Sequence, residues 1–137
     1  MTSERIVSES SPIRELAADV DGAIYWTEQR SADGGKTSLV RQAPDGTRTD
    51  VVAPPFDVRS RVHEYGGGAF AVSAGTVVFS NDADKRVYRI DPGSAPVAIT
   101  PAQGDARYAD LVIDRLRKRV FAVREVHDGG DVTNEIV

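Results

Sequence analysis

The run VDGAIYWTEQ, residues 20–29, begins with a turn and continues with residues that favour β-strands. A second run, SAGTVVFSND at residues 73–82, has the same order. When Gly22 is set against Gly75, Trp26 falls opposite Phe79. Glycine tolerates the positive φ that tight hairpin turns require. Two such runs about 50 residues apart predict a repeated β unit.

The segments that follow these two runs recur in the same order. The matching pairs are residues 39–41 with 87–89, Pro44 with Pro92, and residues 52–54 with 99–101. A third copy begins at Tyr108 and continues at residues 120–123, and its next strand would begin near Asn134. Each unit then holds four strands over about 40 to 50 residues, which is the length of a propeller blade. A plain antiparallel meander is the alternative, and the aligned aromatic residues favour blades.

The predicted fold is therefore all-β, a partial β-propeller of about two and a half four-stranded antiparallel blades. Its expected parts are a flexible tail at residues 1–10, blades at 11–58 and 59–105, and a truncated blade at 106–137. Trp26, Phe79 and Phe121 recur at one position of the unit, which predicts a role in the core between blades. The sequence stops inside a predicted strand, so we expect it to be a piece of a longer protein.

Composition excludes several classes of protein. The 137 residues carry a net charge of −4 and no basic stripe, which argues against a nucleic-acid partner. The absence of cysteine excludes disulfides, thiolate zinc sites and a cysteine nucleophile. The polar N-terminus resembles no signal peptide, and no apolar run approaches the roughly 18 residues that span a membrane. We expect a cytoplasmic protein with no membrane partner.

Blade topology predicts one end of the molecule that is rich in loops. There, loops between second and third strands (residues 28–36, 81–85 and 125–131) join the crossings between blades (59–65 and 104–110). Binding residues concentrate on loops at one end of a rigid scaffold. The charged residues gathered at this end are Arg59, Arg61, His63, Glu64, Arg107, Asp110, Arg124, Glu125 and His127.

The sequence holds no complete catalytic or cofactor motif. No G-x-S-x-G turn is present, so a serine nucleophile of the α/β-hydrolase type is missing. His63 and His127 lie beside carboxylates, but their spacing matches no known metal-ligand run, and hydrogen bonds to the neighbouring acids are the favoured reading. A strand rather than a helix follows the glycines at 66–68, which argues against a phosphate loop. We predict no catalytic residue, metal or cofactor, and small glycines that let the inner strand crowd the propeller axis.

The segment RSRVHEYGGGAF, residues 59–70, resembles part of the N-terminal region of prolyl oligopeptidase-family serine peptidases, above all the acylaminoacyl-peptidase or dipeptidyl-aminopeptidase-like branch. Four further stretches are similar, in the same order and at similar separations. They are VVFSNDADKRVYRID (77–91), ITP (99–101) with RYAD (107–110), VFAVREVHD (120–128) and TNEIV (133–137). The resemblance covers nearly the whole chain after residue 11, and the R-x-R-V-H-E-Y-G-G-G run is its most specific element.

The resemblance implies a gate rather than an enzyme. In that family an N-terminal propeller restricts the access of peptides to an α/β-hydrolase domain, which carries the catalytic triad. This chain would supply early blades that pack on that domain, with peptides as the substrate of the whole protein. Arg59, Arg61, His63, Glu64 and Tyr65 are the expected gating or interdomain residues, with direct substrate contact as the alternative. A stand-alone propeller module that self-associates through its exposed edges is the other hypothesis.

Overall fold

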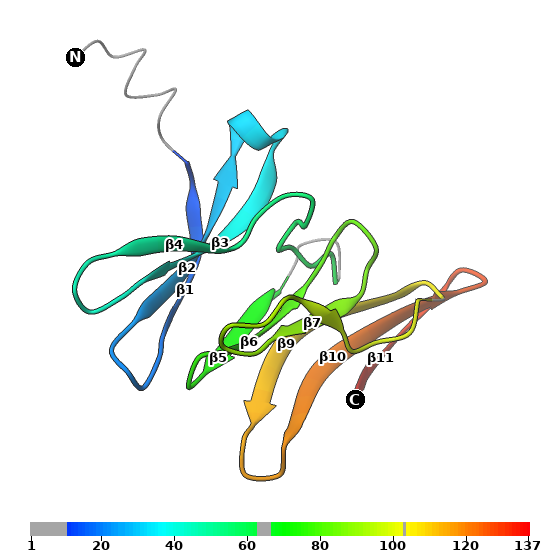
Figure 1. Ribbon diagram of the computed structural model, residues 1–137. Helices are drawn as coiled ribbons and strands as arrows, with labels where there is room; N and C mark the ends of the chain where they lie inside the picture. Colours follow the sequence, from blue (N-terminus) through cyan, green and yellow to red (C-terminus); the bar gives the residue numbers. More distant parts are fainter. Residues whose placement is uncertain (1–10, 63–66, 103) are drawn as a thin grey trace.

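The computed structural model describes residues 11–62, 67–102 and 104–137, so the predicted tail at 1–10 lies outside the described residues. It contains three antiparallel sheets of four, four and three strands, which confirms the all-β partial propeller (Figure 1). The elements are β1 (Ile13–Ala18), β2 (Ile24–Arg30), the 3-10 turn η1 (Ser31–Asp33), β3 (Lys36–Gln42), β4 (Arg48–Val52), β5 (Phe70–Ser73), β6 (Thr76–Ser80), β7 (Val87–Ile90), β8 (Val97–Ala98), β9 (Ala106–Asp114), β10 (Arg119–Asp128) and β11 (Asp131–Ile136).

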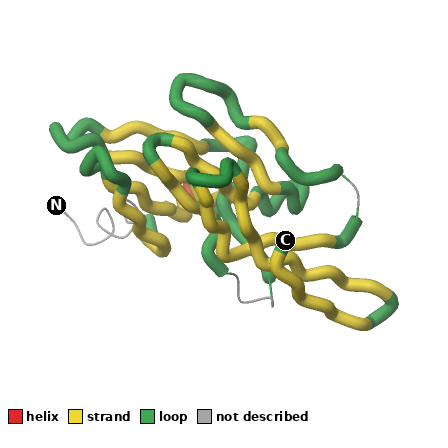
Figure 2. Tube along the Cα trace, turned by 90° about the horizontal axis from the view of Figure 1, so that it is seen from below, coloured by secondary structure: helices red, strands yellow, loops and turns green. Residues whose placement is uncertain are grey.

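Each sheet is a simple meander, because short turns join strands that pair in chain order. The turn between β5 and β6 has two central residues, Ala74 and Gly75, with φ of 45° and 80°. Positive φ at both positions matches the twist of the two strands that the turn joins. The first strands of the sheets meet, since β1 contacts β5 and β5 contacts β9. Figure 2, seen from below, shows the three sheets in succession.

Two apolar clusters hold the sheets together. Tyr25 and Leu39 of the first sheet pack against Val77 and Phe79 of the second, and all four are buried. On the other face of the second sheet, Val78 packs with Leu111 and other residues of the third. Burying each such side chain contributes about 1.5–3 kcal/mol, so the packing at these two interfaces stabilises the association of the sheets. Among the described residues, no helix is long and apolar enough to cross a membrane.

The predicted position in the core between blades is confirmed for Phe79, which lies in the cluster between the first and second sheets, and is wrong for Phe121. Trp26 is buried but belongs to neither cluster between sheets, and the guanidinium of Arg48 lies over its ring, 5.3 Å from the ring centre. Trp26 and Phe79 are 6% and 0% exposed. Phe121 is only half-buried and lies under the guanidinium of Arg119, 4.6 Å from the ring centre. Its neighbour Ala122 packs against the second sheet instead. In the third unit, the residue that faces the neighbouring sheet is therefore Ala122, one position later than the sequence alignment of the units predicts. A shift of one residue along a strand moves a side chain to the opposite face of the sheet.

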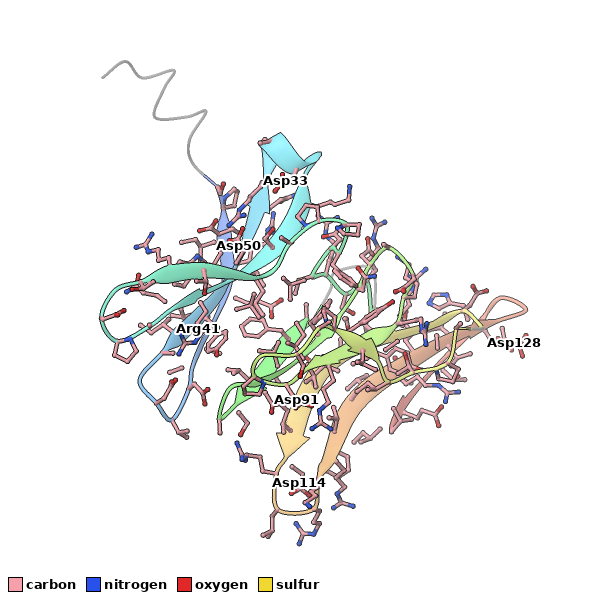
Figure 3. All side chains as sticks on the ribbon, viewed as in Figure 1. Asp33, Arg41, Asp50, Asp91, Asp114 and Asp128 are labelled. Atoms are coloured by element: carbon pink, nitrogen blue, oxygen red, sulfur yellow. The ribbon has the colours of Figure 1, made fainter. Side chains whose placement is uncertain are left out.

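The loop predicted at residues 125–131 is also wrong. β10 continues to Asp128 and pairs with β11, which begins at Asp131 rather than near Asn134. The turn between them is Gly129–Gly130, both with positive φ. Figure 3 shows Asp33, in the connection between β2 and β3, and Asp114, at the turn after β9, at opposite ends of the molecule. Connections from first to second strands thus lie opposite the loop-rich end.

Candidate functional site

The crossing from the first sheet to the second, residues 57–62, is anchored by its own backbone and by the Asp57 carboxylate. Asp57 accepts the N–H of Thr37 at 2.9 Å, and its backbone N–H donates to the side-chain oxygen of Asn81, also at 2.9 Å. Val58 donates to the carbonyl of Thr37 and forms an isolated β-bridge with Asn81. Arg59 donates its backbone N–H to the carbonyl of Ser80 at 3.1 Å. The Asp57 carboxylate and the backbone of Val58 and Arg59 therefore fix the crossing to two sheets before its arginine side chains are considered.

One carbonyl joins the crossing to the third sheet. The hydroxyls of Ser60 and Ser80 both donate to the carbonyl oxygen of Tyr108, at 2.6 and 2.7 Å. Ser60 and Ser80 are 7% and 5% exposed, so water competes little for these bonds. Because a carbonyl oxygen has two lone pairs, both acceptor positions of Tyr108 are filled.

Arg61 is held by partners on both neighbouring sheets. Its Nε donates to Oδ2 of Asp82 at 3.0 Å, and Lys85 Nζ contacts Oδ1 of the same carboxylate. Arg107 Nη1 donates to the carbonyl of Arg61 at 3.1 Å. The Asp82 side chain is 9% exposed, whereas that of Arg61 is 54% exposed. Arg61 therefore lies over a nearly buried acid that is shared with a second cation.

Arg59 differs from Arg61, although the sequence suggested similar roles. Its side chain is partly buried, and no described residue forms a hydrogen bond or ion pair with its guanidinium. It lines a hollow of about 10 Å³ together with Arg61, Lys85 and Arg107. The serine, asparagine and aspartate side chains at the same hollow are already bonded to protein partners. We call this hollow and its four cations the crossing hollow.

Three predicted site residues, His63, Glu64 and Tyr65, lie outside the described residues. His127 lies on β10, where its Nε2 is 2.6 Å from Oε1 of Glu125. Glu125 is 1% exposed, so a buried acid binds this imidazole, as the neighbouring acids led us to expect. The described residues contain no group of three or more side chains placed to hold a metal ion.

The glycine segment lies against the innermost strand of the third sheet. A Cβ on Gly67 would lie 2.8 Å from Cβ of Ala109, so only glycine fits without a shift. Gly68 donates its N–H to Oδ1 of Asp110 at 2.9 Å. Ala69 donates to both carboxylate oxygens of Glu15, the nearer at 3.0 Å. Burial raises the pKa of Glu15, and the charge of Asp110 raises this pKa further. The close approach expected of these small residues is thus observed at Gly67.

Sequence reasoning missed Asp19, in the turn after β1. Its Oδ1 accepts the N–H of Ala74 and its Oδ2 the N–H of Gly75, both at 2.7 Å, and Oδ1 also accepts the N–H of Val20. The carboxylate is 8% exposed and bridges the first sheet to the second. The signal was Asp19 itself, which directly precedes the VDG turn at residues 20–22, but such aspartates usually bond within their own turn.

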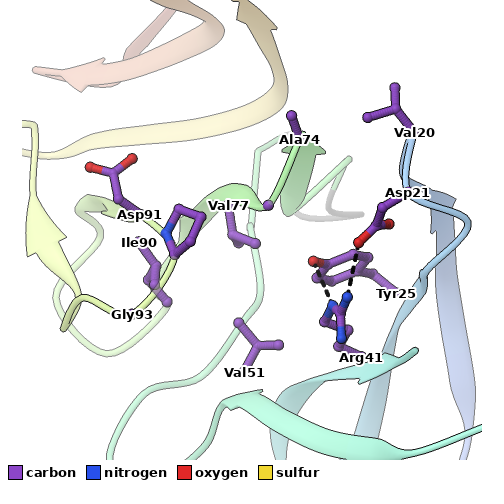
Figure 4. A pocket seen from close by; sticks show the side chains of 12 residues that line it. Val20, Asp21, Tyr25, Arg41, Val51, Ala74, Val77, Ile90, Asp91 and Gly93 are labelled. Atoms are coloured by element: carbon purple, nitrogen blue, oxygen red, sulfur yellow. Dashed lines mark hydrogen bonds and ion pairs between the residues drawn. The ribbon is translucent and has the colours of Figure 1, made fainter. Parts of the chain in front are cut away.

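Sequence reasoning also missed a cavity of about 500 Å³ between the first two sheets (Figure 4). Val51, Val77 and Ile90 form much of its apolar lining. Arg41 lies on one wall and donates to the Tyr25 hydroxyl at 3.2 Å and to Asp21 at 2.9 Å (Figure 4). Backbone bonding from Ala23, and then the bond from Arg41, lower the pKa of Asp21. Arg41, Tyr25 and Asp21 therefore bond to one another on this wall, while Asp91 on the opposite side accepts hydrogen bonds from Thr76 and Arg89.

Comparison with known proteins gives a consistent picture. No family model matches the chain. No curated protein matches it. Among solved structures, puromycin hydrolase is 32% identical over 96% of this chain with a TM-score of 0.85. A puromycin-hydrolyzing peptidase of Mycobacterium tuberculosis is 30% identical over 92% of it, with a TM-score of 0.80.

A more distant structure, virginiamycin B lyase from Staphylococcus aureus, is 14% identical with a TM-score of 0.58. The match covers 92% of this chain and 41% of the lyase, and it supports the fold alone. The chain spans only 22% of puromycin hydrolase and 21% of the mycobacterial peptidase. A mutant of puromycin hydrolase was crystallised in complex with PGG. Both fold and sequence therefore agree with the resemblance carried by residues 59–70. The chain is similar in fold and sequence to part of puromycin hydrolase, a prolyl oligopeptidase-family peptidase, which is consistent with an N-terminal propeller fragment of such a protein.

Proposed function

We propose that this chain supplies the first blades of a propeller that packs on an α/β-hydrolase domain and restricts that domain to small peptides. The blades themselves are not catalytic, and the chemistry belongs to the domain they cover. The match to about a fifth of two peptidases, over 96% and 92% of this chain, is the observation that carries the proposal.

Rigid joints between the blades support a gating role. A gate that excludes large substrates must hold its width, and each pair of neighbouring sheets is joined by buried polar bonds as well as apolar packing. Asp19 joins the first sheet to the second, and Ser80 joins the second to the third. Arg61 lies in the same framework, which favours bracing of the crossing over direct contact with substrate. The proposal also includes the predicted blade boundaries, with one blade at residues 11–58, a second at 59–105 and a truncated third at 106–137.

A graft into a matched peptidase tests the proposal. The corresponding segment of puromycin hydrolase is replaced by this chain, and cleavage of a short peptide is compared with cleavage of casein. We expect the chimera to keep the preference of the intact enzyme for the short peptide. An enzyme lacking the segment should lose that preference. A chimera that cleaves casein as readily as the truncated enzyme would contradict the gating role, and the isolated chain should show no turnover.

A second candidate function is a self-associating module. It is favoured by exposed apolar side chains on the outer sheets: Leu16 is 73% exposed on β1, and Val112 and Ile136 are 55% and 79% exposed on the third sheet. Such surfaces and edges promote association. Sedimentation equilibrium distinguishes the two functions, because a monomer at micromolar concentration contradicts the module. Cell fractionation would test the predicted cytoplasmic location.

A further inference from the structure

The crossing hollow is cationic within an acidic chain. Net charge is −4, yet four cations (Arg59, Arg61, Lys85 and Arg107) line a hollow of about 10 Å³. Asp82 is the carboxylate that lines it, and Arg61 and Lys85 both bond to that acid. The positive charge of the other two cations is therefore not balanced by the acid that lines the hollow.

Arg59 and Arg107 both have donors available. Arg59 uses its backbone N–H on Ser80, so its Cα is fixed, while its guanidinium has no partner among the described residues. Arg107 gives Nη1 to the carbonyl of Arg61, which leaves its other N–H groups for another acceptor. The cross-strand neighbour of Arg107 is Glu125, whose Oε1 bonds to His127. A partly buried guanidinium without an acceptor is costly, and an anionic ligand would remove that cost.

The size and charge of the surroundings indicate which anion fits. A hollow of about 10 Å³ has room for roughly one water-sized group, such as a carboxylate oxygen. Asp57, Asp82 and Asp84 lie on the segments that surround it, and their charges disfavour a dianion such as phosphate. The guanidinium fork matches the two oxygens of a carboxylate. A single negative charge on a planar group is therefore the best match.

We propose that Arg59 and Arg107 bind the free C-terminal carboxylate of a short peptide. The proposal rests on the proposed function, since it names the class of peptide that the gate admits. Two arginines of the same motif then have different roles: Arg61 braces the crossing, and Arg59 contacts the peptide. Peptides whose C-terminus is amidated lose the recognised group.

Binding of triglycine to the 137-residue chain tests the proposal, with triglycine amide as the analogue that lacks the carboxylate and backbone amide NMR shifts as the readout. We expect triglycine to shift the amides of Arg59, Ser60 and Tyr108, and triglycine amide to bind at least tenfold more weakly. Arg59→Gln should weaken triglycine binding at least tenfold. Because its guanidinium forms no hydrogen bond or ion pair with a described residue, this variant should keep the wild-type fold and most of its amide spectrum. Arg61→Gln removes the same charge two residues away and should weaken binding less than threefold.

Two results would overturn the proposal: equal affinity for triglycine and its amide, or unchanged triglycine binding in Arg59→Gln. A second measurement identifies the source of the carboxylate. The catalytic domain of puromycin hydrolase, added in trans, should bind wild type and Arg59→Gln equally well. A tenfold loss in that assay, without triglycine binding, would assign Arg59 to a carboxylate of the domain and overturn the peptide assignment. If the domain does not bind wild type at all, the proposed function fails while the triglycine result stands.

Discussion

Replacing Asp19 by alanine should loosen the first sheet from the second. The carboxylate receives two N–H groups from the turn between β5 and β6, those of Ala74 and Gly75, at 2.7 Å each. Removing it leaves both donors without their acceptor, at a site where the aspartate itself is 8% exposed. No other described side chain bonds to these two N–H groups.

The expected loss of stability follows from those two bonds. A hydrogen bond to a charged group contributes about 1.5–3 kcal/mol, and we take the lower end because water reaches Ala74 once the carboxylate is gone. Two bonds then give about 3 kcal/mol. Asp19→Asn keeps one acceptor oxygen and should lose about half as much. Asp45 offers a matched control, because its carboxylate is exposed and accepts the N–H of Thr47 within its own turn. Asp45→Ala should cost only about 0.5 kcal/mol.

Urea unfolding followed by the fluorescence of Trp26, the single tryptophan, measures these differences. The midpoint should fall in the order wild type, Asp45→Ala, Asp19→Asn, Asp19→Ala, with little change in the m-value. Equal losses for Asp19→Ala and Asp45→Ala would refute the reasoning, since the bridge between sheets would then contribute no more than a local turn.

Three further outcomes are expected. Ala74 has φ of 45°, so Ala74→Asn should raise stability by about 0.5–1 kcal/mol in the same urea assay, and an unchanged midpoint would contradict strain in this turn. Val51 lines the inter-sheet cavity, so Val51→Ile should stabilise the protein by up to about 0.8 kcal/mol. Val97→Ile, at an exposed position on β8, is the control and should not change stability, and equal effects of the two substitutions would argue against cavity filling. Carbon-detected NMR should give Glu15 a pKa above its ordinary value of 4.5, and Asp110→Asn should lower it. A raised carboxyl pKa means that the folded state binds the proton more tightly, so stability falls as pH rises from 4.5 through the folded pKa, and Glu15→Gln should flatten that slope.

The strands of the first two sheets could be predicted because turn residues and alternation agree there. Gly22 and Gly75 both have positive φ, as the aligned runs required, and Trp26 and Phe79 are both buried. The third sheet was harder to predict. A shift in the pairing of β9 with β10 falls between Phe121 and Val123, and such irregularities leave no mark on a pattern of alternating residues.

Much of the site could not be predicted because it depends on partners far away in the chain. Arg59 and Arg61 look equivalent in sequence, and only the position of Asp82 separates a braced cation from an unpaired one. The bridging role of Asp19 depends on a turn 55 residues later. Pairings of this length are set by how the sheets stack, which local propensity does not encode.

Each bond between sheets described above joins a residue to a partner that is synthesised later, and this sets an order for folding during synthesis. The first sheet can pair its own strands once residue 52 has left the ribosome. Glu15 and Asp19, however, gain their partners in the second sheet only when residues 69–75 have followed. Ser60 and Ser80 then wait in turn for Tyr108. Each blade is thus completed by the blade made after it. A pause in translation just after the first sheet would leave the Asp19 carboxylate exposed to water, without the N–H groups of Ala74 and Gly75.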